Sequence, residues 1–113
     1  MKKFLAVYIG SMSASAAARA AMTEDDKQRG MQAWGQWMME HGSEIVDNGG
    51  PLGKTKQISK KGIADISNAL TGYVIFEAES HQAAAQMFEN HPHFSIFPGD
   101  SVEVMEIMAM PGA

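Results

Sequence analysis

The sequence predicts an α+β fold of the ferredoxin-like kind, a βαββαβ antiparallel sheet with two helices on one face. Three observations lead to this prediction. Segments rich in β-branched and aromatic residues alternate with two segments that follow a helix-capping residue. Two of the strand segments are apolar at consecutive positions, which is typical of central strands. The length of 113 residues suits one hydrophobic core, so we expect residues 1–113 to form a single domain.

The first strand and the first helix are predicted from the N-terminal third. Residues 3–9 are apolar and β-branched, as a central strand requires. Residues 10–22 are rich in Ser and Ala without an amphipathic period, so we expect a loop or a ragged helical turn. Thr23 is a good helix cap, and three acidic residues follow it, where carboxylates meet the positive end of the helix dipole. We expect this helix to end at Gly42.

The middle of the chain is predicted to be irregular. Residues 44–47 indicate a short strand, and Asn48-Gly49-Gly50-Pro51 indicates a turn because Gly and Asn accept positive φ. A polar insert follows at about residues 53–70. Within it, residues 55–59 and 63–67 alternate weakly, which favours an extension or hairpin whose register the pattern does not assign.

The last part of the chain repeats the pattern of strand, helix and strand. Residues 72–78 predict a strand with apolar groups on both faces. Ser80 is the predicted cap of a second helix, which should end before Pro92. Pro98-Gly99-Asp100 indicates a turn, and residues 101–110 a final strand.

A sheet with helices on one face leaves its other face open to water. Because two strands carry apolar residues on both sides, that open face would be a large exposed apolar patch. A symmetric dimer is the simplest cover. We therefore predict that the protein pairs with itself, sheet to sheet, as a homodimer.

Charge and composition exclude several classes of protein. The formal net charge is -4, which argues against a nucleic-acid binder because such proteins neutralise phosphates with clustered Lys and Arg. Without cysteine there is no thiolate metal site. The glycines of residues 49–53 lack the strand-to-helix setting and the Lys-Ser/Thr pair of a phosphate loop. We expect no cofactor.

The N-terminus imitates a secretory signal peptide, with Lys2 and Lys3 before an apolar run. The run is short, and Arg19 lies where a cleavage site should be neutral, so a first strand is the preferred interpretation. No segment approaches the roughly 20 apolar residues of a membrane span. We expect a cytoplasmic protein that does not interact with a membrane.

Several motifs together resemble the YCII-related family, including its DGPF-like branch. They are Gly42, the turn Gly50-Pro51-Leu52, the strand 73–79, the cap Ser80, the segment His91-Pro92 and the final strand around residues 102–104. The resemblance spans most of the chain. It implies a small ferredoxin-like domain that pairs as a dimeric α+β barrel.

The family's suspected enzymes carry a histidine on the first helix and an aspartate just before the Gly-Pro turn. The corresponding positions here are Met31 and Gly49, with Asp47 further upstream. A Met/Gly pair cannot exchange protons. The resemblance therefore implies the fold more than any reaction.

His91-Pro92-His93 is the most conspicuous local motif. Two imidazoles beside a rigid proline could bind a metal or act as acid and base. The more common role of such histidines is to cap a helix end. Two histidines are also an incomplete ligand set, so we expect no metal site.

A ligand cavity is predicted beside the first helix. Met31, Trp34 and Met38 lie at helical spacing, and aromatic rings and thioethers can give a planar or apolar molecule broad contact. We expect these three side chains, with Tyr73, to form a pocket between the helix and the sheet. Core packing is the competing role for the same stripe.

Three functions remain open from the sequence. The leading hypothesis is a domain that binds a small apolar or aromatic molecule. The first alternative is an oxygenase or isomerase of the dimeric α+β barrel kind that uses no cofactor, with His91, His93 or Asp65 transferring protons. The second is a non-catalytic interaction or regulatory module, which the lack of a cavity beside Trp34 would favour.

Overall fold

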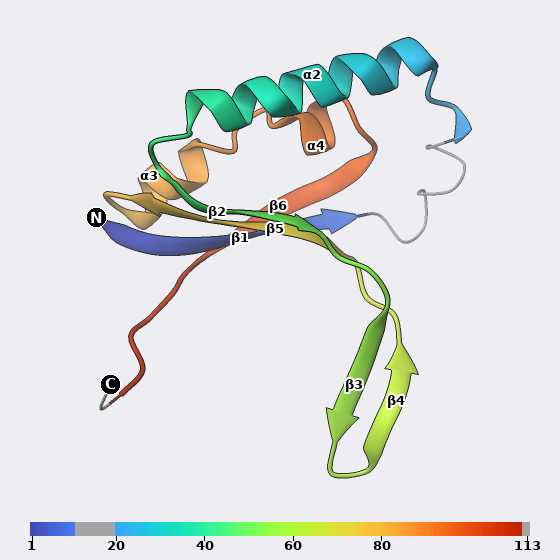
Figure 1. The fold of residues 1–113 in the computed structure, drawn as a ribbon, viewed down its shortest axis with the longest axis vertical. Helices are drawn as coiled ribbons and strands as arrows, with labels where there is room; N and C mark the ends of the chain where they lie inside the picture. Colours follow the sequence, from blue (N-terminus) through green and yellow to red (C-terminus); the bar gives the residue numbers. More distant parts are fainter. Residues whose placement is uncertain (11–19, 112–113) are drawn as a thin grey trace.

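The structure, a computed structural model, describes residues 1–10 and 20–111. Its main sheet has the strand order β2-β5-β1-β6, and all neighbouring strands are antiparallel. The strands are β1 (Lys2–Gly10), β2 (Ile45–Pro51), β5 (Leu70–Ala78) and β6 (Gly99–Glu106). The helices α2 (Glu24–Glu40), α3 (His81–Gln86) and α4 (Pro92–Ser95) lie on one face of this sheet (Figure 1). This arrangement confirms the predicted ferredoxin-like α+β fold.

The core lies between the sheet and the helices. Phe4, Ala6 and Tyr8 of β1 alternate toward this side, and the register sets Phe4 beside Phe76 of β5, with ring centroids 5.8 Å apart. All four residues are buried, and Phe4 and Phe76 are fully inaccessible to solvent. Replacing such a side chain by Ala leaves a cavity and typically costs about 3–5 kcal/mol. The sheet and the helices are therefore held together mainly by aromatic packing.

The opposite face of the sheet is also apolar. Its apolar positions in the two central strands and β6 are Leu5, Val7, Ile9, Tyr73, Ile75 and Met105. Among the described residues, no helix covers this face (Figure 1). The prediction that the central strands carry apolar groups on both sides is confirmed. In the following sections we name these six positions the uncovered face.

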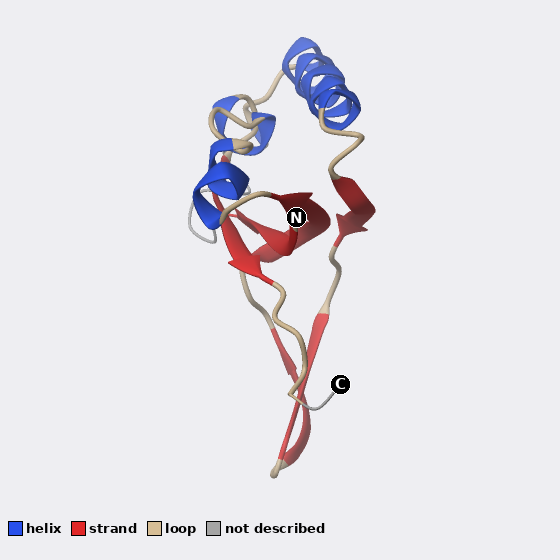
Figure 2. Ribbon diagram, turned by 90° about the vertical axis from the view of Figure 1, so that its left-hand side faces the viewer, coloured by secondary structure: helices blue, strands red, loops and turns tan. Residues whose placement is uncertain are grey.

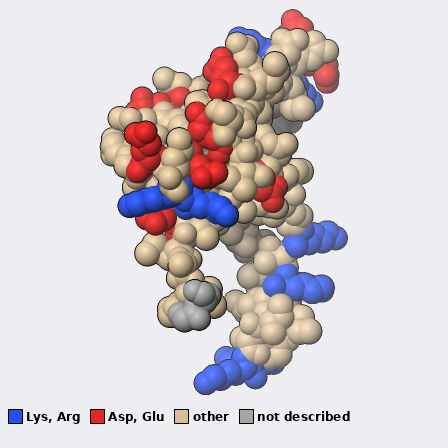
Figure 3. Space-filling view, turned by 60° about the vertical axis from the view of Figure 1, so that its left-hand side comes forward, with Lys and Arg blue, Asp and Glu red and all other residues tan. Residues whose placement is uncertain are grey.

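A two-stranded hairpin extends from the sheet between β2 and β5. Its strands are β3 (Thr55–Ser59) and β4 (Gly62–Ile66), and their register pairs Ile58 with Ile63. We name residues 54–67 the arm. Figures 1 and 2 show that the arm projects on the side opposite the helices, and Figure 3 shows that Lys side chains are spread along it. The predicted polar hairpin is confirmed, and its register is now assigned.

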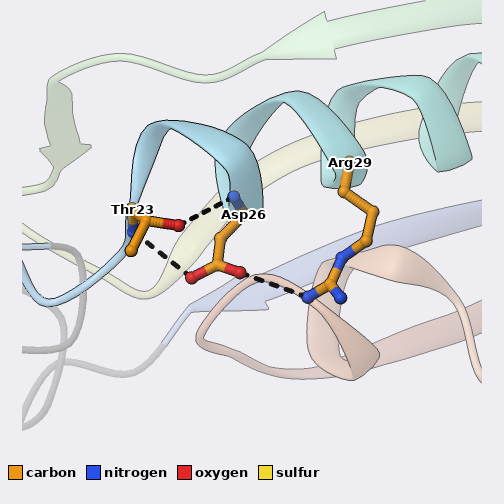
Figure 4. A network of polar contacts seen from close by, with 3 residues as sticks. All are labelled: Thr23, Asp26 and Arg29. Atoms are coloured by element: carbon orange, nitrogen blue, oxygen red, sulfur yellow. Dashed lines mark hydrogen bonds and ion pairs between the residues drawn. The ribbon is translucent and has the colours of Figure 1, made fainter.

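The start of α2 follows the predicted cap. The Thr23 hydroxyl accepts a hydrogen bond from the Asp26 main-chain N–H at 3.0 Å, and the Asp26 carboxylate accepts one from the Thr23 N–H at 3.2 Å (Figure 4). Arg29 donates to the same carboxylate at 3.3 Å. The Thr23 bonds and the nearby Arg29 charge lower the pKa of Asp26. Such a reciprocal capping box satisfies two main-chain donors that the helix itself leaves free.

The predicted turn at residues 48–51 is wrong. These residues belong to β2, which is longer than residues 44–47 and pairs with β5 through two register irregularities. Gly49 adopts a φ of 64° within the strand. Glycine and proline here mark a bulged edge strand, because β2 has only one neighbour in the sheet and a bulge re-aims the chain without ending it.

The predicted end of the second helix before Pro92 is confirmed, but the role of Pro92 is corrected. The helix α3 ends at Gln86, and Pro92 begins α4 where it was expected to act as a stop. Proline is well suited to the first position of a helix, where its missing N–H is not needed. Gly99 and Asp100, expected in a turn, open β6, which ends at Glu106 before the predicted Met110.

Two further expectations concern the N-terminal part. The loop or helical turn expected at residues 10–22 falls largely outside the described residues, since 11–19 are not described. In the part of the chain that is described, the helices are too short or too polar to cross a bilayer.

Candidate functional site

An open cavity of about 730 Å³ lies between α2, the ends of β1 and β5, and the chain that links α4 to β6. Its apolar wall includes Trp34 and Met31 from α2 and Phe97 from the α4–β6 link. Among the described residues the lining is Gly10, Met22, Lys27, Met31, Trp34, Gly35, Thr71, His93, Phe97, Pro98 and Gly99. A volume of this size is within the range of small-molecule sites in proteins.

A smaller hollow of about 210 Å³ adjoins the large cavity. Trp34 and Thr71 border both spaces, so the Trp34 side chain stands between them. Tyr8, Met38 and Asn48 also line the smaller hollow. The Trp34 ring is 4.9 Å from the Tyr8 ring and 4.6 Å from the His91 ring, centroid to centroid. Trp34 is thus anchored by rings on its inner side and open to the cavities on the others.

Two glycines shape the side of α2 that faces the large cavity. A Cβ at Gly30 would come within 2.5 Å of the Phe97 ring, so this glycine lets Phe97 pack directly on the helix. A Cβ at Gly35 would meet no atom within 4 Å, although Gly35 lines the cavity. Glycine inside a helix costs about 1 kcal/mol relative to Ala. No packing contact among the described residues requires a glycine at position 35. What the glycine provides in return for this cost is open space in the cavity wall.

A chain of buried polar groups lies beneath Trp34. The His91 Nδ1 atom accepts a hydrogen bond from the His93 main-chain N–H at 3.0 Å. Neutral His91 therefore carries its proton on Nε2, which lies 3.4 Å from the Tyr8 hydroxyl and donates to it. His93 donates from Nε2 to the Ile9 carbonyl at 2.8 Å. These bonds join β1 to the start of α4 and fix the orientation of both imidazoles.

Burial shifts the proton affinities of two members of this chain. The pKa of His91 is lowered from 6.5 to about 4, first by burial and then by the charges that His93 and His41 carry when protonated. Burial raises the pKa of the Tyr8 hydroxyl well above its ordinary value of 10. At neutral pH both groups are therefore uncharged, and the floor of the site is polar without being ionic.

Acidification should destabilise the protein through His91. Its pKa is about 4 in the folded state and about 6.5 in the unfolded state, so stability should be complete above pH 6.5 and fall as the pH drops toward 4. A shift of this size corresponds to about 2–3 kcal/mol. Urea unfolding should show that the wild type loses about this much more unfolding free energy between pH 7 and pH 4 than His91→Gln does, because the variant lacks the buried imidazole. Parallel pH profiles for the two proteins would contradict this account of His91.

Most of the side chains predicted to form the site lie together in the structure. Met31 and Trp34 line the large cavity, as does His93, while Trp34, Met38 and Tyr73 border the smaller hollow. By strand alternation the Tyr73 side chain lies on the uncovered face with Ile75, away from the helices. The prediction that this side chain forms the pocket wall between helix and sheet is therefore wrong, and Tyr73 borders the smaller hollow through its place in the strand.

The two other predicted catalytic residues are placed differently. His91 is fully buried behind Trp34 and does not line the large cavity. Asp65 lies in β4 on the arm, where its carboxylate accepts a 2.6 Å hydrogen bond from Lys56 and is largely exposed. The structure does not bring Asp65 to the histidines. No group of three or more His, Asp or Glu side chains placed to hold a metal occurs among the described residues.

Most of the other lining residues were not predicted from the sequence, among them Tyr8, Gly35, Thr71 and Phe97. Tyr8 was counted only as a strand residue, and Thr71 lay just before the predicted strand 72–78. Their places at strand ends near the α2 stripe become visible only with the register. Gly30 and Gly35 did carry a signal, because two glycines inside a predicted helix need a packing or functional reason.

The fold and the cavity define a class: a ferredoxin-like α+β domain with a cavity between its long helix and its sheet. Neither a scan of protein-family models nor a search of curated proteins gave a match.

Among solved structures the chain is similar to 5-chloro-2-hydroxyhydroquinone dehydrochlorinase (TftG) from Burkholderia phenoliruptrix AC1100, in complex with 2,5-dihydroxybenzoquinone. The identity is 17%, the TM-score is 0.59, and the alignment covers 96% of each chain. At this identity the likeness shows a shared fold over nearly the whole length.

Proposed function

We propose that the protein is a homodimer that binds a small apolar or aromatic molecule in the large cavity beside Trp34. The observation that carries this proposal is the cavity itself, about 730 Å³ with Met31, Trp34 and Phe97 in its wall. Pockets of this kind, mostly apolar with a few fixed polar groups, are the usual sites of small-molecule binding. The presence of a cavity beside Trp34 argues against a purely structural or regulatory module.

The polar groups around the cavity favour a ring that carries oxygen. Thr71, His93 and Lys27 contribute hydrogen-bonding groups to an otherwise apolar wall. TftG, which shares the fold, was captured with 2,5-dihydroxybenzoquinone, a planar ring with oxygen substituents. At 17% identity this is support for the ligand class only by analogy.

The homodimer is proposed from the exposed surface. The chain exposes 7909 Å², against roughly 6,100 Å² expected of a compact monomer of 12.2 kDa. Its radius of gyration of 15.9 Å also exceeds the roughly 13 Å of a compact domain of this length. Packing the uncovered faces of two copies together would remove part of this apolar surface from water.

Catalysis is a second candidate, and His93 is the observation that favours it. Of the three proton-transfer residues proposed from the sequence, His93 is the one whose side chain lines the large cavity. Because its Nε2 donates to the Ile9 carbonyl, the neutral ring carries a lone pair on Nδ1 for use as a general base. Turnover of a ring substrate that is lost in His93→Gln while binding persists would support this role.

Amide-shift mapping by NMR tests the binding proposal. The wild-type protein would be titrated with 2,5-dihydroxybenzoquinone and with indole, a planar ring without oxygen, and with sucrose as a non-aromatic control. We expect saturable shifts for at least one ring and none for sucrose, centred on the lining residues Gly10, Gly35, Thr71 and Gly99.

A further inference from the structure

One face of the arm carries a pair of exposed isoleucines. The register places Ile58 beside Ile63 and Lys56 beside Asp65 on the same face, while Gln57 and Ala64 form a pair on the other. Ile58 and Ile63 are 73% and 72% exposed. An isolated two-stranded hairpin is only marginally stable in water. An exposed pair of neighbouring isoleucines on such a hairpin is a contact surface that no described residue of the same chain covers.

The arm also carries a charge opposite to the rest of the chain. Residues 54–67 hold four lysines and one aspartate, a charge of +3. Since the whole chain has a net charge of -4, the remainder carries -7. In Figure 3 the Lys side chains of the arm lie apart from most of the Asp and Glu side chains, which are on the body. The positively charged arm and the negatively charged body of this protein therefore attract one another.

The direction of the arm points to the body of a second copy. Figures 1 and 2 show it extending past the sheet on the side of the uncovered face, away from its own helices. Charged residues share that side of the sheet: by the register, Glu77 lies on it in β5, opposite Lys3 of β1, and Glu103 lies on it in β6, opposite Val7. A second copy packed against the uncovered face would lie alongside the arm.

We infer that the arm is a clasp that holds a second copy of this chain. The inference rests on the proposed homodimer and adds a second contact to it. In a two-fold dimer, Ile58 and Ile63 of each arm contact the other copy. Lys60 and Lys61 of the same arm face acidic groups on the uncovered side of that other copy. The pair of arms explains why a polar insert between β2 and β5 forms an ordered hairpin.

The apolar part of the clasp is tested by sedimentation of the full-length chain over a range of concentrations. Replacing both isoleucines, Ile58→Ser with Ile63→Ser, removes four apolar contacts per dimer and should raise the dimer Kd by about 100-fold or more. The matched control is Gln57→Ser with Ala64→Ser on the opposite face of the arm, which should leave the Kd within about threefold. Amide spectra of the main sheet serve as the folding check for both variants.

The outcomes separate the clasp from the homodimer. A wild type that stays monomeric at every concentration overturns both. A wild-type dimer whose Kd is unchanged by the isoleucine variant overturns the clasp and leaves the sheet-to-sheet homodimer standing. A control variant whose dimer Kd rises as much as that of the isoleucine variant also overturns the clasp, because the loss would then not depend on the isoleucine pair.

A charge exchange tests the polar part. Lys60→Glu with Lys61→Glu makes the arm acidic, and Glu77→Lys with Glu103→Lys makes the uncovered side basic. Each variant alone should dissociate about tenfold more readily, because both arm contacts become repulsive. An equimolar mixture should form a heterodimer of wild-type strength, since both of its arm contacts again join opposite charges. A mixture as weak as the separate variants overturns the assignment of these acidic residues.

Discussion

Replacing Gly35 by Trp should lower the affinity of the large cavity for a ring ligand by about 100-fold. A Cβ at this position meets no atom within 4 Å, so the new side chain can enter the cavity without displacing the core. Replacing glycine inside a helix also removes an unfavourable backbone term of roughly 0.5 kcal/mol. The variant should therefore be at least as stable as the wild type while binding is lost, an opposition that simple misfolding cannot produce.

The matched control is Gln32→Trp, which adds the same side chain to an exposed position of α2 outside the cavity lining. Its ligand affinity should stay within about threefold of wild type. Both affinities come from the same amide-shift titration, and stability comes from urea unfolding. Equal affinities in Gly35→Trp and wild type would show that the ligand does not occupy this cavity.

Replacing Gly49 by Ala should cost about 3 kcal/mol of unfolding free energy or more. Gly49 has a φ of 64°, a conformation that costs an L-residue roughly 1 kcal/mol. A Cβ at this position would also overlap the main-chain carbonyl oxygen of Tyr73 in β5, so one of two paired strands must move. Urea denaturation measures the loss, and the slope with denaturant should be unchanged if only β2 is strained.

Gly50→Ala is the control next to it in the same strand. A Cβ there meets nothing within 4 Å, and φ is not positive, so the change in stability should stay within about 0.5 kcal/mol. Because Gly50 lines the smaller hollow, the added methyl group would reduce that space alone. Equal losses in the two variants would contradict the bulge as the reason for Gly49.

The fold could be predicted because each main element has a local signal. Thr23 with its acidic first turn marks α2, and the doubly apolar runs mark β1 and β5 as central strands. The errors occurred where one local pattern permits two structures. Asn48 to Pro51 is equally compatible with a turn and with a bulged edge strand, and only pairing with β5 decides between them. Pro92 similarly can follow one helix or begin another.

The site could be predicted only from the helix side. Met31, Trp34 and Met38 were found because helical spacing puts them on one face, and they do line the two spaces. Tyr8 and Thr71 come from distant strands, and their approach to Trp34 depends on the register of β1 with β5. The burial of His91 was equally hidden, because it depends on Tyr8, Trp34 and Phe88 packing around its ring.

The most direct measurement of the central claim is the position of a bound ring molecule in the wild-type protein. In the amide-shift titration with 2,5-dihydroxybenzoquinone and indole, saturable shifts should gather at Gly10, Gly35, Thr71 and Gly99, which come from four separate segments and all line the large cavity. Residues of the arm, such as Ile58 and Ile63, should not shift. Shifts confined to the arm or the uncovered face, or none for either ring, would contradict a binding site beside Trp34.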